Sequence, residues 1–282
     1  MSDWIEVPLV TTLNREAFLP RATSSKRSDR MLAVLSLLSD RESISLAVLS
    51  DELRVSAATI RRDLADMEAQ GLLVRTHGGA RASGAPTEVP VRLRDSQFRD
   101  AKRRIALRAA ELIPTGPYAI AISGGTTTAE VAKALALRQQ LTIVTNALTT
   151  AVEIASRPNL KVIMTGGVVR SSSFEVVGSL AENTFNAINV GTAILGTDGI
   201  SAKGGATTHD ETEARTNHAM VMHAQRVIVV ADGSKVGRLT LARVAGLDEI
   251  NDLITDSSAD PAELERIAAA GVTIHVVPSG TP

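Results

Sequence analysis

The hydrophobic positions of the N-terminal third recur with helical spacing in three segments. The first covers about Ser28–Leu38, where apolar residues fall on one helical face, and the second covers about Leu46–Leu53. The third begins after Ser56, whose hydroxyl suits the N-cap position, and stops at Gly71. The strand-like stretch LLVRT and the pair Gly78-Gly79 follow, so this part of the chain predicts three helices and a hairpin.

Beyond residue 100 the pattern changes to short apolar runs separated by helical or loop sequence. The runs are rich in β-branched residues and lack strict alternation, which is typical of parallel strands buried on both faces. Their alternation with helices predicts an open α/β sheet. The predicted strands are YAIAI (Tyr118–Ile122), LTIVT (Leu141–Thr145), KVIMT (Lys161–Thr165), TAIL (Thr192–Leu195), RVIVV (Arg226–Val230), DLIT (Asp252–Thr255) and VTIHVV around Thr273.

Two segments show neither pattern. Residues 1–25 have no sustained periodicity and predict a flexible extension. Residues 82–100 carry two prolines and charges of alternating sign, which predicts a linker. The chain therefore divides into a helical domain at residues 26–81 and an α/β domain at residues 101–282.

The composition narrows the class of protein. The chain has 282 residues and no cysteine, which excludes disulfide bonds, thiolate catalysis and cysteine-ligated zinc. Its apolar runs are too short to cross a bilayer, and Asp3 and Glu6 stand where a secretory signal would carry basic residues. We therefore expect a cytoplasmic protein without a membrane partner.

Charge is distributed unevenly along the chain. Residues 15–108 hold 18 lysines and arginines against 12 acidic residues, whereas residues 109–282 hold 12 against 17. A basic module on an acidic body is typical of proteins in which one part meets nucleic acid, although chance also produces such imbalances. The charge asymmetry supports a DNA-binding hypothesis but is not enough to establish one.

The third predicted helix has one apolar stripe and one basic face. Ile60, Leu64 and Met67 are spaced i, i+4 and i+7, so they share the stripe. Ala58 and Arg62 then lie roughly opposite, where a small residue beside an arginine suits close approach to the DNA major groove. The alternative is that the arginines of this helix pair with its acidic residues on a solvated face.

The preceding short helix and turn reproduce the spacing of a helix-turn-helix. The third helix would then be the recognition helix, and the hairpin after it would contact phosphates as the wing of a winged helix does. The predicted DNA-binding residues are Ser56, Ala58, Thr59, Arg61 and Arg62 on the helix, with Arg75 and His77 on the hairpin.

Nearly every strand predicted after residue 100 ends in glycine or a small polar residue. In an open α/β sheet, ligands bind outside the carboxyl ends of the strands. Glycines before a helix expose N–H groups that attract an anion, and basic side chains add charge, although each loop alone is also an ordinary βα turn. The predicted effector-binding residues are Ser123, Gly124, Gly125, Thr126, Thr127, Asn146, Gly166, Gly167, Arg170, Asp198 and Lys235.

The stretch VSAATIRRDLADMEAQGLLVRTHGGA resembles the signature of the DeoR family of bacterial transcriptional regulators. Matching segments continue through the α/β domain, and the resemblance covers about residues 27–256. It implies a winged helix-turn-helix followed by a sensor domain similar to ribose-5-phosphate isomerase, which commonly binds a phosphorylated sugar or related metabolite. The matching segments of the second domain are GGTTT, LTIVTNAL, MTGGVVR, VVGSLAE, LGTDGIS, HDETEA and ADGSKVGR.

Three departures from the family pattern fall in the second domain. The family usually has aspartate where this chain has Ser123, an acidic-basic pair where it has Gly191-Thr192, and lysine where it has Asn217. Each departure removes a charge, and we expect all three to lie near the pocket. They predict an unusual effector and argue against isomerase chemistry, which needs a carboxylate base.

The leading hypothesis is a repressor of a carbohydrate-metabolism operon. Its partners would be a double-stranded DNA operator, a sugar-phosphate effector and further copies of the chain, because a dimer or tetramer spans two half-sites. A sugar-phosphate isomerase with an accessory DNA-binding module is the alternative class. We expect no catalytic residue, cofactor or metal site, since His218 and His223 are five residues apart and do not share a helical face.

Overall fold

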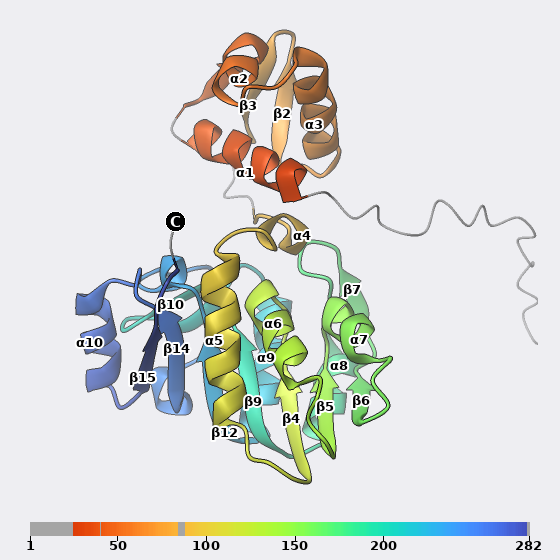
Figure 1. Cartoon of the computed structure of the whole chain (residues 1–282), viewed down its shortest axis with the longest axis vertical. Coiled ribbons are helices and arrows are strands. Elements are labelled where there is room, and N and C mark those ends of the chain that lie inside the picture. The colour runs from red at the N-terminus through yellow and green to blue at the C-terminus, as the bar shows by residue number, and fades with distance from the viewer. Residues whose placement is uncertain (1–24, 40, 84–87, 281–282) are drawn as a thin grey trace, which may run out of the picture.

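The computed structural model describes residues 25–39, 41–83 and 88–280 as two domains connected by a short helix, α4 (Val91–Arg94) (Figure 1). The flexible extension expected for residues 1–25 falls, apart from Ser25, outside the described residues. The N-terminal domain has three helices and an antiparallel sheet in the order β1-β3-β2. Its elements are α1 (Ser25–Ser39), β1 (Ser43–Ser45), α2 (Leu46–Glu52), α3 (Ala57–Ala69), β2 (Leu73–Thr76) and β3 (Gly79–Ala82).

The three helices enclose one hydrophobic core. Ile60, Leu64 and Met67, the stripe predicted from spacing, are at most 2% exposed. They pack with Leu49 of α2 and Val34 of α1, both fully buried. The amphipathic pattern of α3 therefore determines which face of this helix turns outward.

A tight turn sets the angle between α2 and α3. Arg54 adopts the left-handed conformation with φ of 51°, and the N–H of Val55 donates to the carbonyl of Ser50. Ser56 is the N-cap of α3, as predicted, because its hydroxyl accepts a hydrogen bond from the N–H of Thr59 at 3.3 Å. The predicted helix-turn-helix is present, and β2 and β3 form the hairpin behind it.

The second domain is built on a seven-stranded, fully parallel sheet in the order β15-β14-β12-β9-β4-β5-β6. Each of the seven predicted apolar runs forms one of these strands. The elements are α5 (Arg99–Leu112), β4 (Tyr118–Ile122), α6 (Thr126–Leu135), β5 (Leu141–Thr145), α7 (Leu148–Ile154), β6 (Leu160–Met164), β7 (Val168–Arg170), β8 (Glu175–Val177), α8 (Ser179–Asn186), β9 (Val190–Gly196), β10 (Gly199–Ser201), β11 (Gly205–Thr208), α9 (Glu211–Met222), β12 (Ala224–Val230), β13 (Ala242–Ala245), β14 (Asp252–Asp256), α10 (Pro261–Ala269) and β15 (Thr273–Val277).

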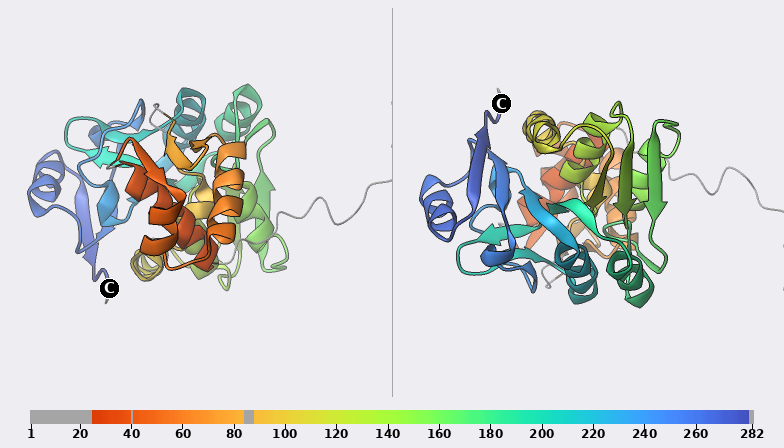
Figure 2. Two further views of the ribbon diagram at one scale, coloured as in Figure 1. Left: turned by 90° about the horizontal axis from the view of Figure 1, so that it is seen from above. Right: turned by 90° about the horizontal axis from the view of Figure 1, so that it is seen from below.

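Helices cover both faces of the sheet, as Figures 1 and 2 show. On one face α5 and α6 enclose a core that contains Ile105, Val131 and Ile143. On the other face α8 and α9 contribute Phe185 and Met220 to a second core. Burial on both faces explains why the strands of this sheet lack alternating polar positions.

The sequence pattern did not predict five short strands. β7 and β8 form a hairpin, and β10, β11 and β13 form a small antiparallel sheet beside the main one. Each has only three or four residues, which is too short for hydrophobic periodicity to show. β7 pairs with β8 and β10 with β11 across short loops, and β13 joins β11 from further along the chain.

The segment expected to be a linker, residues 82–100, contains regular structure in the part that the structure describes, residues 82–83 and 88–100. β3 extends to Ala82, α4 occupies Val91–Arg94 and α5 begins at Arg99. Val91 and Leu93 are 4% and 1% exposed, so tertiary burial offsets the cost of ordering this short helix. In Figure 1, α4 lies between the winged helix and the sheet domain. None of the described helices combines the length and apolar character needed to cross a bilayer.

Candidate DNA interface and effector pocket

The outward face of α3 carries unpaired arginines. Arg61, Arg62 and Ala58 are exposed, and within the described part of the chain neither arginine forms an ion pair. The acidic residues of α3 have other partners, so the salt-bridged face that the sequence left open as an alternative is not formed. Free guanidinium groups beside a small residue leave this face able to contact DNA phosphates and bases.

Asp63 is the buried link between α3 and α1. Its carboxylate is 2% exposed and accepts from Arg27 Nε at 3.1 Å and from Arg30 Nε at 2.5 Å. Arg27 also contacts Asp66. Arg27, Arg30 and Arg62 border the same groove, and Asp63 connects the two helices, α1 and α3, that form this basic surface. Sequence spacing gave no sign of this contact, because Arg27 and Asp63 are 36 residues apart.

Of the predicted wing residues, His77 lies in the hairpin turn and Arg75 lies in β2. His77 is exposed, and Arg75 is 43% exposed at the side chain. Arg75 is not free, since Glu68 accepts its backbone N–H at 2.9 Å and lies 3.7 Å from its guanidinium. The hairpin is thus anchored to the recognition helix, which sets the wing's position relative to that helix.

A pocket of about 450 Å³, including space open to solvent, lies at the carboxyl edge of the sheet. Its walls come from the ends of β4, β9 and β12, together with residues that follow α4. The chain runs from β4 toward β5 on one side and from β9 toward β12 on the other, so β4 and β9 mark the point where strand order reverses. Ligands bind at this point in open α/β sheets.

Three cationic side chains meet in this pocket. Lys102 is 4% exposed and donates from Nζ to the carbonyl of Arg94 at 2.7 Å. Burial lowers the pKa of Lys102 to about 8, and burial also lowers the pKa of Lys235, with Arg94 adding repulsion. Arg94 Nε is buried without a hydrogen-bond partner among the described residues. A bound anion would offset the cost of burying these cations and the repulsion between them.

The first turn of α6 adds backbone donors to the same pocket. Gly125 is the N-cap, has φ of 124° and supplies no side-chain cap, so the N–H groups that follow it have no capping partner on this residue. Thr126 and Thr127 line the pocket beside Lys235. N–H groups at a helix start and nearby cations both attract anions, so this arrangement could hold an anionic group.

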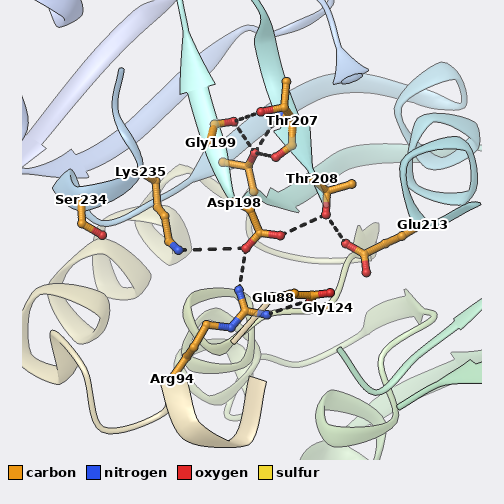
Figure 3. Close-up of polar contacts among 12 residues, drawn as sticks. Glu88, Arg94, Gly124, Asp198, Gly199, Thr207, Thr208, Glu213, Ser234 and Lys235 are labelled. Carbon is orange, nitrogen blue, oxygen red and sulfur yellow. Dashed lines mark hydrogen bonds and ion pairs between the residues drawn. The ribbon is translucent and has the colours of Figure 1, made fainter. Parts of the chain in front are cut away.

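Asp198 joins two of the cations from the edge of the pocket (Figure 3). Its Oδ1 lies 2.5 Å from Arg94 Nη1 and 4.0 Å from Lys235 Nζ, and Thr208 contacts the other oxygen. Burial opposes ionisation of Asp198, yet Arg94 and Lys235 outweigh it and lower the pKa of the carboxyl. Asp198 therefore stays ionised and holds Arg94 in place.

The structure gathers some of the predicted effector residues and not others. Gly125, Thr126, Thr127 and Lys235 line the pocket, and Asp198 contacts it through ion pairs. The remaining predicted residues are not among those that line the pocket. They are Ser123, Gly124, Asn146, Gly166, Gly167 and Arg170.

Ser123 is a fully buried brace between two strands. Its hydroxyl accepts the N–H of Gly196 at 2.9 Å and donates to the carbonyl of Gly124. At Gly124 a Cβ would lie 2.1 Å from Oε1 of Glu175, so this glycine makes room for a carboxylate behind the loop. Gly167, by contrast, is exposed and serves the β7–β8 hairpin, with φ of 137°.

Asn146 and Asn217 belong to a buried polar cluster around Glu175. Both amides donate to Glu175 Oε2 at 3.0 Å, and Asn146 also donates to Asn217 at 3.1 Å. Burial, and then the charge of Glu213, raises the pKa of Glu175 well above its usual value. The residue at the family's lysine position is therefore an amide that hydrogen-bonds a carboxyl whose neutral form is favoured by burial.

Arg170 does not supply charge to the pocket as predicted. It forms ion pairs with Glu88, Asp210 and Glu213. Burial alone would lower the pKa of Arg170, but these carboxylates outweigh burial and raise it. The β7–β8 hairpin carries the side chain toward α9 rather than toward α6. Its role is to connect Glu88, just before α4, to the sheet domain.

The expectation that all three family departures lie near the pocket is wrong for Gly191. This residue is at the amino end of β9, the opposite end of the strand from the pocket. A Cβ there would lie 2.2 Å from the ring of Tyr118, whose hydroxyl bonds Thr192 at 3.1 Å. The packing of Tyr118 against Gly191 leaves no room for a larger side chain, and this position lies away from the pocket.

Sequence reasoning missed the pocket residues that come from the interdomain segment. Arg94 and Lys102 lie in or just after the stretch assigned to a linker, and Asp232 lies among the pocket-lining residues beyond β12. Arg94 precedes α5 and Lys102 lies within it. Nothing in the local sequence indicates that they meet the loop around Lys235, more than 100 residues further along the chain. Within the described residues, no group of three or more His, Cys, Asp or Glu side chains is arranged to hold a metal ion.

A winged helix with free arginines on its recognition helix, joined to a sheet domain with an anion pocket, defines a DNA-binding transcriptional regulator. Two family models match the chain: the DeoR-like helix-turn-helix domain at residues 30–84 and the DeoR C terminal sensor domain at residues 97–257. The chain belongs to the DeoR family of transcriptional regulators.

Among the proteins similar to the chain are two named relatives and one solved structure. The HTH-type transcriptional regulator GlpR of Haloferax volcanii is 38% identical over 77% of this chain and 84% of its own. The glycerol-3-phosphate regulon repressor of Escherichia coli is 33% identical over 71% of this chain and 79% of its own. Ribose 5-phosphate isomerase from Plasmodium falciparum matches with 13% identity and a TM-score of 0.35 over 48% of this chain and 51% of its own.

The Asp63 contact predicts a difference between two acidic residues of α3. Asp63→Asn should lower the free energy of unfolding of the N-terminal domain by about 1–3 kcal/mol, because two arginines lose a buried charged acceptor. Asp66→Asn, whose carboxyl is 52% exposed, should cost at most about 1 kcal/mol. Calorimetric unfolding of the full chain measures both, and equal losses for the two variants would contradict the buried link.

Proposed function

We propose that this regulator represses a carbohydrate-metabolism operon and that a phosphorylated sugar or related metabolite releases it from its operator. The observation that carries the proposal is the convergence of Arg94, Lys102 and Lys235 on the first turn of α6. The name of one relative, a glycerol-3-phosphate regulon repressor, supports both the sign of regulation and a phosphate ester as ligand.

A phosphate monoester fits the donors of the pocket. It carries a charge of about −1.5 to −2 at neutral pH and offers three acceptor oxygens. The N–H groups of Thr126 and Thr127, the ammonium of Lys102 and the free Nε of Arg94 are the matching donors. The remainder of the ligand would extend toward Asp198 and Thr197, whose oxygens suit hydroxyl groups.

We further propose that the chain is not an enzyme. Isomerisation of a sugar phosphate needs a carboxylate that takes a proton from carbon. The ion pair with Arg94 lowers the basicity of Asp198, and Asp232, the carboxylate that lines the pocket, accepts hydrogen bonds from Ser234. Incubation with a panel of sugar phosphates should give no turnover, and isomerised product that disappears in an Asp198→Asn variant would favour the enzyme instead.

The same function calls for more than one copy of the chain. One winged helix reads one half-site, and a dimer or tetramer spans two. We therefore propose a homo-oligomer, which light scattering of the purified chain would detect.

The recognition helix predicts the loss of operator affinity in one variant. Arg62→Ala should weaken binding to a duplex selected from random sequence by about 5- to 150-fold and reduce the salt dependence by about one ion, because one guanidinium leaves the DNA surface. Arg157→Ala removes an exposed arginine from the sheet domain and should leave the affinity unchanged. Fluorescence anisotropy at matched salt measures both, and unchanged binding in Arg62→Ala would remove this residue from the interface.

The buried ammonium predicts how ligand affinity depends on pH. A bound anion favours protonated Lys102 and raises its pKa from about 8, so affinity is full below pH 8 and falls as pH rises through it. The decline should approach tenfold per pH unit at most, since about one proton is linked. Calorimetric titration with glycerol 3-phosphate and ribose 5-phosphate between pH 7 and 9.5 measures this slope.

Two variants test whether Lys102 is the group responsible. Lys102→Met should weaken phosphate-ester binding by about tenfold or more at pH 7 and flatten the pH dependence, because a charge-assisted hydrogen bond is lost. Lys161→Met, which removes an exposed lysine from β6, should match the unaltered chain. Equal affinity in the two variants would place the phosphate elsewhere.

A further inference from the structure

Helix α4 belongs to the hydrophobic core of the N-terminal domain. Leu93 is 1% exposed and packs in the cluster formed by Met31, Val34 and Leu38 of α1. Val89, just before the helix, packs against the same cluster. A displacement of Leu93 therefore requires α1 to move with it or leaves a cavity in a close-packed core.

The same helix is bound to the sheet domain by polar contacts. The N–H of Val91 donates to the carbonyl of Ser172 at 2.8 Å, and Glu88 pairs with Arg170. Arg94 pairs with Asp198, as Figure 3 shows, and its carbonyl accepts from Lys102. One helical turn thus touches the winged-helix core through Leu93 and the pocket through the next residue.

Arg94 is the contact that a ligand would change. Its guanidinium has five donors, of which Nε has no partner among the described residues, while its carboxylate partners are Asp198 and, at 3.7 Å, Glu88. Both carboxylates have other partners, since Lys235 lies near Asp198 and Arg170 pairs with Glu88. Neither carboxylate would be left as an isolated buried charge if Arg94 turned to another anion.

We propose that α4 is the element through which the pocket controls the winged helix, with Arg94 exchanging Asp198 for an anionic ligand and Leu93 transmitting the displacement to α1. This inference rests on the proposed function for the identity of the ligand. The coupling between Arg94 and the DNA-binding domain is a property of the chain itself and exists without a ligand. An effect of about 5- to 150-fold on operator affinity is usual for such coupling.

A ligand-free comparison tests the coupling directly. Arg94→Gln breaks the ion pair with Asp198 and should weaken operator binding by about fivefold or more. Arg92→Gln is the matched control, because it removes the same charge from an exposed position of the same helix. Anisotropy titrations of the full chains with the selected duplex measure both, and equal affinities for the two variants would overturn the inference.

A double-mutant cycle tests the role of Leu93. In a Leu93→Ala background, the additional change Arg94→Gln should alter operator affinity by less than about twofold, since the path to α1 is lost. Leu93→Val takes its place if the alanine variant does not bind operator. An undiminished effect of Arg94→Gln in either background would show that Leu93 does not transmit the change.

The cycle separates this inference from the proposed function. Absence of calorimetric binding of inorganic phosphate, glycerol 3-phosphate and ribose 5-phosphate to the unaltered chain would reject the ligand class while the cycle still supports coupling through α4. Phosphate binding combined with a failed cycle would uphold the proposed function and reject α4 as its route.

Discussion

The ion pair between Arg94 and Asp198 fixes α4 against the sheet domain, and the coupling proposed between the two domains depends on it. It joins a four-residue helix to the carboxyl edge of the sheet, at the point where strand order reverses. So short a helix has no stability of its own, and burial of Leu93 on one side and charge pairing on the other hold it in place. The junction between the domains and the wall of the pocket are consequently the same few residues.

Burial has different consequences for ionisable groups in two regions near the carboxyl edge of the sheet, the cluster around Glu175 and the cationic pocket. Around Glu175, burial and the nearby charge of Glu213 favour the neutral carboxyl, and two amides complete its hydrogen bonds. In the pocket, Lys102 and Lys235 remain cations although burial lowers the pKa of each. Of the two positions at which the family resemblance implied a charge, Asn217 belongs to the cluster around Glu175 and Ser123 braces Gly196, and neither lines the cationic pocket.

Local patterns predicted most of the fold, and they did so where one element's own residues decide the outcome. The spacing of Ile60, Leu64 and Met67 identified the buried face of α3, and the β-branched runs located all seven strands of the main sheet. The site was only partly predictable. Glycines before α6 and threonines in its first turn follow from the rule for strand ends, whereas Arg94 and Lys102 enter the pocket through tertiary contacts that no local pattern contains. Arg170 shows the converse, since a basic residue after a strand met three carboxylates instead of a ligand.

The energetics of the pocket explain why a regulator would place its anion site at a domain junction. In the ligand-free chain, burial disfavours the charged forms of Lys102 and Lys235, and Arg94 repels both. An anion relieves this cost, so its binding free energy is largest in the arrangement that brings all three cations to it. A ligand shifts a conformational equilibrium only by its difference in affinity for the two states. Because Arg94 lies on α4 and the two lysines lie on the sheet domain, the position of α4 determines how many cations the anion meets. Under the proposed function, the difference in affinity therefore depends on the position of α4, whose Leu93 packs in the winged-helix core.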